Sequence, residues 1–584
     1  MKSFFKFFLA AFLALVVFCV VALFFFVGVL GSKLSETAPV IAEKSVLEID
    51  LSKRYEERPV KDLQAVVQSE SLGQPPSLYD LIRLIEKAKS DDRIGGILLK
   101  ADGNGNGFAS SDEIRNALIG FKQSKKFIIA YADMMSQKAY GIANVSDKIY
   151  VSPKGFFEWV GFSVNYMFLK GALDKLEVKP QIFYAGKFKS ATEPLRAEKM
   201  TAENKLQTTV WLNDIYNDFL VHTAEARKLD TAALHRLADE GAIQTPEDAM
   251  AHKLIDGLKY DDEIQEEIKH RLKIDSTKKI NFVSIEKYKA AHKDLSGSGD
   301  DIALIYATGS IVDGDGDAQN IGSANYIDLL RKARLDKSIK AIVVRVNSGG
   351  GSALASENIW REMSLAKKEK PLIVSFGDVA ASGGYYISVP ADSIFASKST
   401  ITGSIGVFGV VPDLSSFFKN KLGITFDGVA TGPLANAGNI DHPMTEREKA
   451  LVQTHIEDTY QQFKQRVAQG RKKDTAYVET IAQGRVWTGL KAKDAGLIDA
   501  YGGLQQAIAA AAKKAKLTDY EVREYPKSEN WLERMLGMDG AAISETKVQK
   551  ELGDDYYQIY RQVLKIKEMT QGAQTRLPFD FTIQ

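Results

Sequence analysis

Gly377-Asp-Val-Ala-Ala-Ser-Gly-Gly-Tyr-Tyr386 is a stretch that this chain carries twice, once intact and once damaged. The damaged copy reads Ala132-Asp-Met-Met-Ser-Gln-Lys-Ala-Tyr140, in which Gln137 stands where the intact copy has Ser382. A turn of small residues with a serine at its tip is what an exposed nucleophile needs. A second copy that lacks the serine predicts a tandem repeat whose two halves have divided their roles.

The repeat extends well beyond this serine loop. Residues 81–100 show a helical pattern followed by a short buried strand, and residues 329–345 show the same order. The closing Leu-Ile-Asp of residues 254–256 returns at 497–499, a separation of 243 residues. Within each half, short β-branched runs alternate with amphipathic helices, which indicates an α/β fold with mostly buried strands. A unit of about 240 residues is a domain duplication rather than a solenoid repeat.

The length of 584 residues is too great for one hydrophobic core, so several domains are expected. The polar, glycine-rich run after His292 marks the boundary between the two repeats. The last segment has no repeat partner and shows a helical pattern around residues 556–569. The predicted divisions are an N-terminal span at 1–32, a first repeat at 33–292, a linker at 293–300, a second repeat at 301–526 and a helical extension at 527–584.

The N-terminus predicts a membrane anchor. Lys2 and Lys6 precede an uncharged apolar run from Phe7 to Ser32, which is long enough to cross a hydrocarbon core of about 30 Å. A cleavable secretory signal is the alternative, but its apolar region is usually only about 7–15 residues long. The lysines place the N-terminus in the cytoplasm and the rest of the chain outside the membrane. Cys19, the only cysteine, lies within this span and has no disulfide partner.

The net charge of +1 gives no reason to expect a nucleic-acid partner. There is no His-Glu-x-x-His pair that would indicate a zinc protease, and no phosphate-binding loop of the Gly-x-x-x-x-Gly-Lys type. We therefore expect neither a metal nor an organic cofactor.

Glycine-rich turns beside the serine point to acyl-transfer chemistry. Residues 345–352 contain a glycine triplet at 349–351, directly after a strand, and consecutive glycines expose backbone N–H groups. An acyl-transfer enzyme needs such donors next to its nucleophile to stabilise the developing oxyanion. Gly350, Gly351 and Gly383 are the candidate oxyanion donors. A third strand-to-turn junction lies at residues 402–406.

A serine nucleophile also needs a base, and the repeat indicates a lysine. None of the seven histidines lies in a glycine loop or beside a strand end. Burial lowers the pKa of a lysine enough for it to replace histidine. Lys189 follows a predicted strand, and aligning Gly186 with Gly432 places Lys189 on Ala435. The first half thus keeps a lysine and lacks the serine, whereas the second half keeps only the serine.

These residues resemble the long, tandem-repeat form of the signal peptide peptidase A family, also called protease IV. The resemblance covers nearly the whole chain and rests on Ala-Ala-Ser-Gly-Gly-Tyr at 380–385, Gly-Lys-Phe-Lys-Ser-Ala at 186–191 and Thr-Gly-Ser-Ile-Gly at 402–406. It implies that Ser382 is the nucleophile, Lys189 the general base, and Ser404 a hydrogen-bond partner of the lysine. The chain departs from the family at Gly349, where a proline is usual.

The resemblance also implies a fold and a biological setting. The fold would be two tandem domains similar to the crotonase and Clp-protease superfamily, built from repeated ββα units. The activity would be that of a serine endopeptidase, anchored in the bacterial inner membrane, with its catalytic domains on the extracytoplasmic side. It would degrade cleaved signal peptides and other apolar peptides, as a homotetramer and without a cofactor.

Two other functions stay open from the sequence. A crotonase-like scaffold also supports acyl-CoA chemistry with the same kind of oxyanion loop. The damaged first-half loop shows that a catalytically silent membrane scaffold can arise from this repeat. The sequence also leaves open whether Lys189 and Ser382 pair within one chain or between neighbouring subunits.

Overall fold

The computed structural model describes residues 6–8, 12–18, 21, 39–59, 76–292, 299–317, 319–526, 569–570, 572–577 and 583. Within these ranges no helix is both long enough and apolar enough to cross a membrane. The predicted anchor at 1–32 falls largely outside the described residues. The same is true of linker residues 293–298 and of most of the predicted extension at 527–584.

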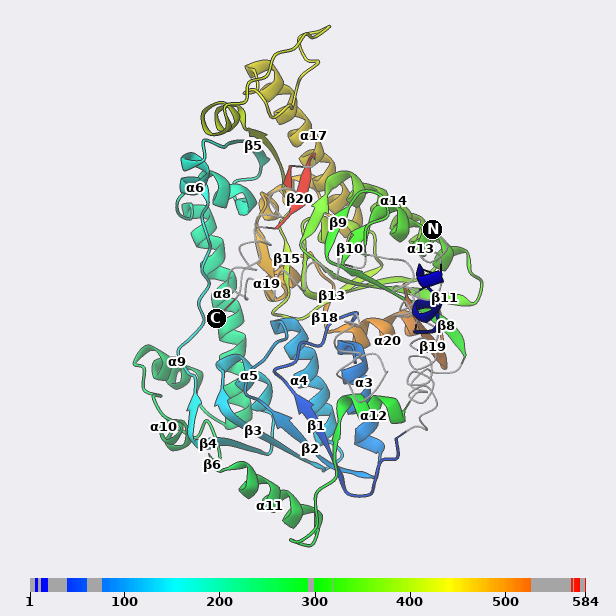
Figure 1. Cartoon of the computed structure of the whole chain (residues 1–584). Coiled ribbons are helices and arrows are strands. Elements are labelled where there is room, and N and C mark those ends of the chain that lie inside the picture. The colour runs from blue at the N-terminus through cyan, green and yellow to red at the C-terminus, as the bar shows by residue number, and fades with distance from the viewer. Residues whose placement is uncertain are drawn as a thin grey trace.

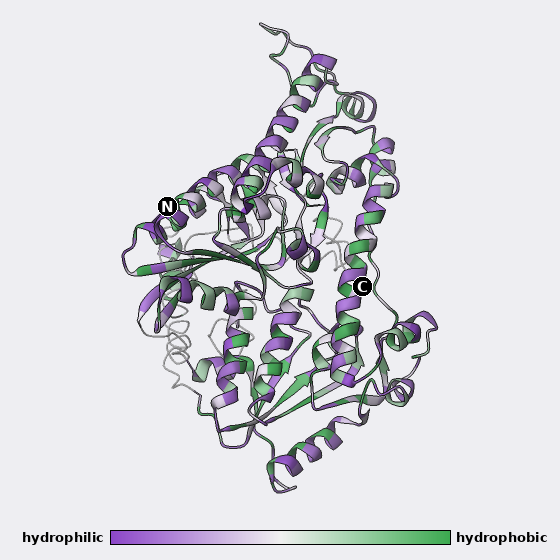
Figure 2. Cartoon of the chain, turned by 180° about the vertical axis from the view of Figure 1, so that it is seen from behind, coloured by the Kyte–Doolittle hydropathy of each residue, from purple (hydrophilic) through white to green (hydrophobic). Residues whose placement is uncertain are grey.

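The first half is built on a parallel six-stranded sheet (Figure 1) in the order β6-β4-β3-β2-β1-β7. Its strands are β1 (Ser45–Asp50), β2 (Ile94–Lys100), β3 (Phe127–Met135), β4 (Lys148–Phe157), β6 (Gly257–Leu258) and β7 (Phe282–Ser284). One face packs on α3 (Leu78–Ser90) and α4 (Phe108–Lys122), and the other packs on α11 (Asp261–Leu272). Because both faces are covered, the central strands are mostly apolar, as Figure 2 shows.

The second half repeats this plan in a larger sheet, ordered β17-β15-β13-β11-β8-β19. Its strands are β8 (Asp300–Thr308), β11 (Ile339–Ser348), β13 (Leu372–Ala381), β14 (Ser393–Ala396), β15 (Ile401–Gly403), β17 (Val486–Thr488), β18 (Ala500–Tyr501) and β19 (Tyr520–Tyr525). Strand β13 forks, since residues 373–375 pair with β14 whereas residues 379–381 pair with β15. The fork sends the end of β13, and therefore the serine that follows it, toward the joint between the halves.

Helices of the second half cover both faces of its sheet. Helices α13 (Ser323–Leu335) and α14 (Ala353–Glu369) pack on one face, and α20 (Leu504–Ala515) packs on the other. The shorter helices of the chain are α5 (Gln137–Ala143), α6 (Lys170–Lys175), α7 (Glu193–Arg196), α9 (Thr231–Asp239), α10 (Pro246–Ala251), α12 (Ile285–Ala291), α15 (Gly383–Ser388), α16 (Ser415–Phe417), α18 (Thr475–Ile481) and α19 (Gly489–Asp494).

The two longest helices among the described residues are copies of each other. Helices α8 (Ala202–Arg227) and α17 (Glu446–Arg471) each contain 26 residues. Thr201 and Thr445 cap their N-termini by accepting a hydrogen bond from a backbone N–H of the first turn. Both helices end at a lysine in the left-handed conformation, Lys228 and Lys472. In Figure 1, α8 runs alongside both halves, whereas α17 rises from the second half.

A third sheet joins the halves, in the order β10-β9-β12-β20-β16-β5. Strand β5 (Lys179–Ala185) of the first half pairs antiparallel with β16 (Val407–Asp413) of the second half over seven residues. The remaining strands are β9 (Ser310–Val312), β10 (Asn320–Gly322), β12 (Gly350–Ser352) and β20 (Gln574–Arg576). Strand β5 thus lies against the second half, as Figure 1 shows. The residues that directly follow β5 in sequence therefore also lie at the second half.

Buried polar contacts hold the halves together. The guanidinium of Arg345 is fully buried and lies 2.7 Å from Glu57 and 2.5 Å from Glu113, both in the first half. The carboxylate of Asp378 accepts hydrogen bonds from the backbone N–H and the hydroxyl of Ser110 at 3.0 and 2.7 Å. A buried charge is tolerated only when it is paired, so these contacts fix how the two halves meet.

Candidate active site

Ser382 sits in a strained turn between β13 and α15. Its backbone has φ 54° and ψ −114°, a conformation that side-chain-bearing residues rarely adopt. The Ser382 N–H donates to Gly403 O at 2.8 Å, and this bond ties the turn to β15. Such strain costs on the order of 1–3 kcal/mol and is concentrated at functional sites. The turn fixes the direction of the hydroxyl, which is fully buried.

Lys189 reaches this hydroxyl from the other half of the same chain. It follows β5, and its Nζ lies 2.8 Å from Ser382 Oγ although 193 residues separate the two in sequence. The same Nζ lies 3.1 Å from both the hydroxyl and the backbone oxygen of Ser404. The structure therefore brings the three predicted side chains together within one subunit.

Burial controls the charge of Lys189. The side chain is only 1% exposed, and this burial alone lowers the pKa of its amine well below 10.5. A neutral amine carries two N–H donors and one lone pair. When the N–H groups point to the two oxygens of Ser404, the lone pair faces Ser382 Oγ. The amine is then placed to accept the hydroxyl proton.

The residues on either side of Lys189 are held by Gln207 on α8. Its Nε2 donates to Phe188 O and to Ser190 Oγ, each at 3.1 Å. Its Oε1 accepts from the N–H of Val486, in the second half, at 3.1 Å. Sequence reasoning missed Gln207, because a glutamine in the middle of a long helix carries no signal of what it faces.

The three predicted oxyanion glycines differ in what their backbones contact. Gly350 and Gly383 are in close contact, since a Cβ atom on Gly350 would lie 2.6 Å from the Gly383 nitrogen. The N–H of Gly350 donates to Ser348 Oγ at 3.1 Å. Gly351 lies one residue further along β12, where it pairs with both β9 and β20. Of the three glycines, Gly350 and Gly383 are therefore the two that lie in close contact beside Ser382.

The damaged copy keeps the fold of the intact one. Tyr140 donates to Leu254 O at 2.7 Å, and Tyr385 makes the same contact with Leu497 O at 2.9 Å. Where the second half has its serine, the Gln137 side chain is buried and accepts hydrogen bonds from the backbone at residues 160–161. The amide thus fills its own turn and offers no nucleophile.

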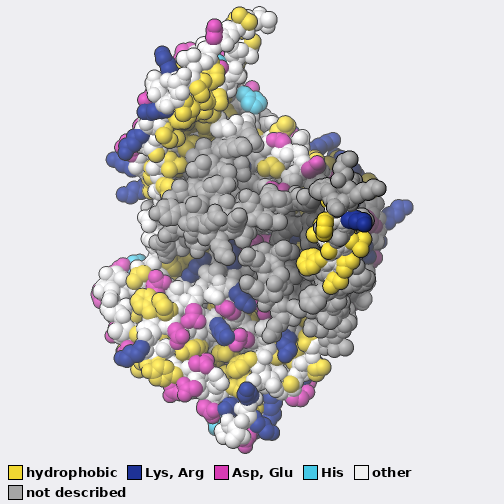
Figure 3. Space-filling view, in the orientation of Figure 1, with side chains coloured by type: hydrophobic (Ala, Val, Ile, Leu, Met, Phe, Trp, Pro, Cys, Tyr) yellow, Lys and Arg dark blue, Asp and Glu magenta, His cyan; other side chains and the backbone are white. Residues whose placement is uncertain are grey.

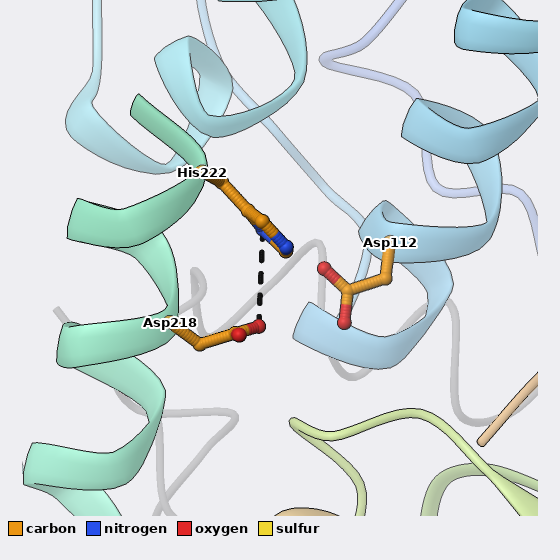
Figure 4. Close-up of side chains that lie close together, drawn as sticks. All are labelled: Asp112, Asp218 and His222. Carbon is orange, nitrogen blue, oxygen red and sulfur yellow. Dashed lines mark ion pairs between the residues drawn. The ribbon is translucent and has the colours of Figure 1, made fainter. Parts of the chain in front are cut away.

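A separate cluster of titratable side chains lies between α4 and α8 (Figure 4). The carboxylates of Asp112 and Asp218 and the ring of His222 converge, with one possible ligand atom of each within 4.8 Å of the others. They line a cavity of about 30 Å³, enough for one water or ion. His222 is half-buried, and burial lowers the pKa of its ring.

This cluster is already tied to the second half. Asp112 accepts hydrogen bonds from the hydroxyls of Ser397 and Ser399, the latter at 2.6 Å. The ammonium of Lys398 lies 3.3 Å from Asp218. Burial raises the pKa of Asp112 to about 7, despite the two hydroxyl donors. A lysine therefore already occupies the place where a cation would neutralise Asp218.

A strand that the sequence did not predict lies across the serine turn. Residues 574–576, inside the predicted helical extension, form β20 between β12 and β16. The helical pattern expected around 556–569 lies almost wholly outside the described residues. Strand β20 has only three residues, and they show no alternation of polar and apolar side chains. A strand of this kind cannot be recognised from the sequence.

The fold and the site together define a hydrolase with a buried serine–lysine pair at the joint of two α/β repeats. The chain belongs to peptidase family S49, whose profile matches residues 120–275 and 364–518, once in each half. It is accordingly a serine peptidase with two copies of the S49 domain. This membership disfavours the acyl-CoA and silent-scaffold alternatives.

Similar proteins agree with this assignment. The chain is 36% identical to a protein named Protease 4 from Salmonella typhi, over 77% of this chain and 74% of that one. It is 35% identical to Protease 4 from Haemophilus influenzae over the same shares. It is also 35% identical to the chloroplastic serine protease SPPA of Arabidopsis thaliana, over 76% and 66% of the two chains.

A solved structure, the ClpP1 N165D mutant from Listeria monocytogenes, matches 35% of this chain and 94% of its own. Its sequence identity of 14% and TM-score of 0.23 are too low to support a statement about this chain's fold.

Proposed function

We propose that this chain is a membrane-anchored signal peptide peptidase that cleaves apolar peptides with a Ser382–Lys189 dyad. The observation that carries the proposal is the 2.8 Å separation of Lys189 Nζ and Ser382 Oγ, with both side chains buried. A serine is a weak nucleophile unless a base accepts its proton. A lysine serves as that base only when it is neutral at working pH, which its burial provides.

The reaction follows from this geometry. Neutral Lys189 takes the proton of Ser382 as Oγ attacks the scissile carbonyl carbon. The resulting ammonium remains hydrogen-bonded to both oxygens of Ser404, which stabilise its charge. It returns the proton to the leaving amine when the peptide bond breaks. Lys189 then activates a water molecule, which hydrolyses the acyl-enzyme and releases the second product.

The oxyanion of the tetrahedral intermediate would lie between Gly350 and Gly383. The N–H of Gly383 follows directly after the nucleophile, so its position is fixed by the same strained turn. The N–H of Gly350 donates to Ser348 Oγ in this structure and would turn to the oxyanion during the reaction. The φ of Gly350 is 96°, a value that glycine adopts without strain.

Anchoring in the bacterial inner membrane is the setting that best fits the N-terminus. The described residues between 6 and 21 are helical, and large apolar side chains among them are exposed, for example Phe7 at 78%. Figure 3 shows apolar side chains gathered on one side of the molecule, with basic side chains nearby. An exposed apolar surface of this kind fits burial in lipid. With the N-terminal lysines in the cytoplasm, the peptidase repeats would lie outside.

A homotetramer fits a second exposed region. The arm between β16 and α17 carries large apolar side chains at its surface, including Leu422, Phe426 and Val429. Burying such side chains against another subunit would remove them from water. The mass of the detergent-solubilised protein, measured by light scattering, tests this part of the proposal.

The catalytic proposal is tested with three variants and one probe. A fluorophosphonate probe should label Ser382 of the native protein, and hydrolysis of an apolar fluorogenic peptide should accompany the labelling. Ser382→Ala should lose both, and Lys189→Ala should reduce both by about 10³-fold or more. Ser404→Ala should have the smaller effect of one lost hydrogen bond. Full activity in Ser382→Ala or in Lys189→Ala would rule out the dyad.

A further inference from the structure

A turn of the second half packs directly against the backbone that carries Lys189. Residues 483–485, which we name the clamp turn, lie between α18 and β17. The carbonyl oxygen of Gln483 accepts a hydrogen bond from the N–H of Phe188 at 2.8 Å, and its Oε1 accepts one from the preceding N–H at 3.1 Å. A Cβ atom on Gly484 would lie 2.6 Å from the backbone nitrogen of Lys189. The two backbones approach so closely that a side chain at residue 484 would displace one of them.

The clamp turn also holds Ser404. The backbone oxygen of Arg485 accepts a hydrogen bond from the N–H of Ser404 at 2.7 Å. The guanidinium of Arg485 stacks on two rings, since its Cζ lies 5.2 Å from the ring centre of Phe188 and 4.6 Å from that of Trp487. Phe188 directly precedes Lys189, and both oxygens of Ser404 accept hydrogen bonds from the lysine amine. Arg485 therefore contacts both the residue before the base and the hydrogen-bond partner of the base.

The first half carries a copy of the clamp turn that supports no catalytic group. The separation of 243 residues found for the closing Leu-Ile-Asp places Gly484 on Gly241 and Arg485 on Ala242. Both glycines are left-handed, with φ of 73° and 58°. Among the described residues, and apart from its own chain neighbours, a Cβ atom on Gly241 would meet only the side-chain amide of Gln244, at 3.4 Å. The left-handed glycine is thus common to both halves, whereas the arginine and the close packing belong to the second half.

Backbone strain in the clamp turn follows the same division. Gln483 has φ 56°, a left-handed value that residues with side chains rarely adopt, whereas its counterpart Glu240 has φ −84°. Strained backbone persists only where the surrounding structure enforces it, and it is concentrated at functional sites. In the strained form the carbonyl of Gln483 meets the N–H of Phe188. Since the first half folds its copy without this strain, contact with the backbone around Lys189 accounts for it.

We infer that Gly484 and Arg485 are positioning residues for catalysis: the clamp turn holds Lys189 in line between Ser404 and Ser382. Gly484 permits the close approach of the two backbones, and the stacked guanidinium of Arg485 holds the residue that precedes the base. Neither residue touches the reacting atoms. A displacement of about 1 Å at a catalytic group costs about 100-fold in rate. This inference rests on the catalytic proposal for Ser382 and Lys189.

A purely structural role for the clamp turn predicts different behaviour. Substitutions would then lower the melting temperature and the amount of folded enzyme, but each folded molecule would keep its kcat and its pH dependence. A positioning role predicts a fall in kcat per folded molecule, with little change in KM. The contacts described above reach residues 187–189 and Ser404 rather than the glycine loop at 349–351.

The first experiment compares Gly484→Ala with Gly241→Ala in the full-length, detergent-solubilised protein. Alanine at either position must adopt a costly left-handed backbone, so both variants should lose stability. Only at residue 484 does the added methyl group collide with the backbone of Lys189. For the apolar fluorogenic peptide, Gly484→Ala should lower kcat by at least about tenfold and change KM by less than about twofold. Gly241→Ala should keep the kcat of the wild type.

The second experiment replaces the arginine. Arg485→Ala introduces the residue that the first half has at this position, and it should lower kcat by about tenfold. Arg485→Lys keeps the charge but lacks the planar face that stacks on a ring, so its kcat should lie nearer to that of Arg485→Ala than to that of the wild type. Arg485→Ala also decides the question if Gly484→Ala does not fold.

The pH dependence of kcat/KM gives a readout that a loss of stability would not change. Burial lowers the pKa of Lys189, and a loosened clamp turn would admit water to its amine, which raises the pKa toward 10.5. The acid limb should therefore move to higher pH in Arg485→Ala, by about 0.5 pH units or more.

Three results would overturn the inference: a wild-type kcat with an unmoved acid limb in Arg485→Ala, an equal fall in kcat in Gly241→Ala and Gly484→Ala, or full recovery of kcat in Arg485→Lys. Each leaves the catalytic proposal intact, because that proposal is refuted separately, by full activity in Ser382→Ala or Lys189→Ala.

Discussion

Gln207 of the first half accepts a hydrogen bond from the backbone N–H of Val486 in the second half at 3.1 Å. The donors of the same amide bind Phe188 O and Ser190 Oγ, which flank Lys189 in sequence. Strand β17, which begins at Val486, pairs with β15 just before Ser404. One side chain therefore links the backbone that carries the base to the backbone that carries its hydrogen-bond partner.

Replacing Gln207 by leucine should reduce kcat by about 10–100-fold while KM changes little. The reason is that a displacement of about 1 Å in a catalytic group costs on this order. The hydrogen bonds of Gln207 reach Phe188, Ser190 and Val486 rather than the glycine loop, so substrate binding should be little affected. Steady-state kinetics on the fluorogenic peptide measure the effect, and melting temperature tests whether the fold is retained. Lys205→Gln, at an exposed position of the same helix, is the control. Unchanged kcat in a folded Gln207→Leu protein would contradict the positioning role.

Lys189→Met should reduce activity by about 10³-fold or more and raise the melting temperature. The folded-state pKa of Lys189 lies well below the 10.5 of an exposed lysine, so between these values the unfolded chain binds a proton that the folded chain does not. Wild-type stability therefore rises with pH across this window. Methionine does not titrate, so its advantage should be largest below the folded-state pKa of Lys189 and shrink as pH approaches 10.5. Melting curves at several pH values test this, and an advantage that stays constant with pH would contradict it.

The pH dependence of activity should also reveal the titration of Lys189. Only neutral Lys189 accepts the serine proton, so kcat/KM should fall as pH drops through its lowered pKa. The acid limb should be absent from the residual activity of Lys189→Met. A limb that persists in this variant would assign the titration to another group.

The sequence predicted which two side chains meet at the candidate site because duplication supplied an internal comparison. The contrast between Gln137 and Ser382 identified the serine, and the contrast between Lys189 and Ala435 identified the lysine. Their meeting within one chain was not predictable, because it depends on β5 pairing with β16 across 222 residues between Ala185 and Val407. Such long-range pairings leave no periodic signal in either strand. The same limit hid β20, which is short and acquires its role only through its neighbours.

The strain at Ser382 predicts a difference between two inactive variants. Its φ of 54° is costly for alanine but not for glycine. Ser382→Gly should therefore be more stable than Ser382→Ala, with the gain partly offset by the greater freedom of glycine in the unfolded chain. A net difference of about 0.5–1 kcal/mol in the free energy of unfolding is expected from chemical denaturation. Equal stabilities would show that the turn relaxes once the hydroxyl is lost.

Asp112→Asn should stabilise the protein at alkaline pH. Burial raises the pKa of Asp112 to about 7, and the neighbouring carboxylate of Asp218 acts in the same direction. Between pH 3.8 and about 7 the folded chain holds a proton that the unfolded chain has lost, so stability falls as pH rises through this window. Asparagine keeps an oxygen for the hydroxyls of Ser397 and Ser399 and carries no charge. Its melting temperature should exceed that of the wild type by about 2 °C or more at pH 8, and the difference should disappear toward pH 4. Asp313→Asn, at an exposed position, should show no such pH dependence, and a difference in the Asp112 variant that is independent of pH would contradict the titration.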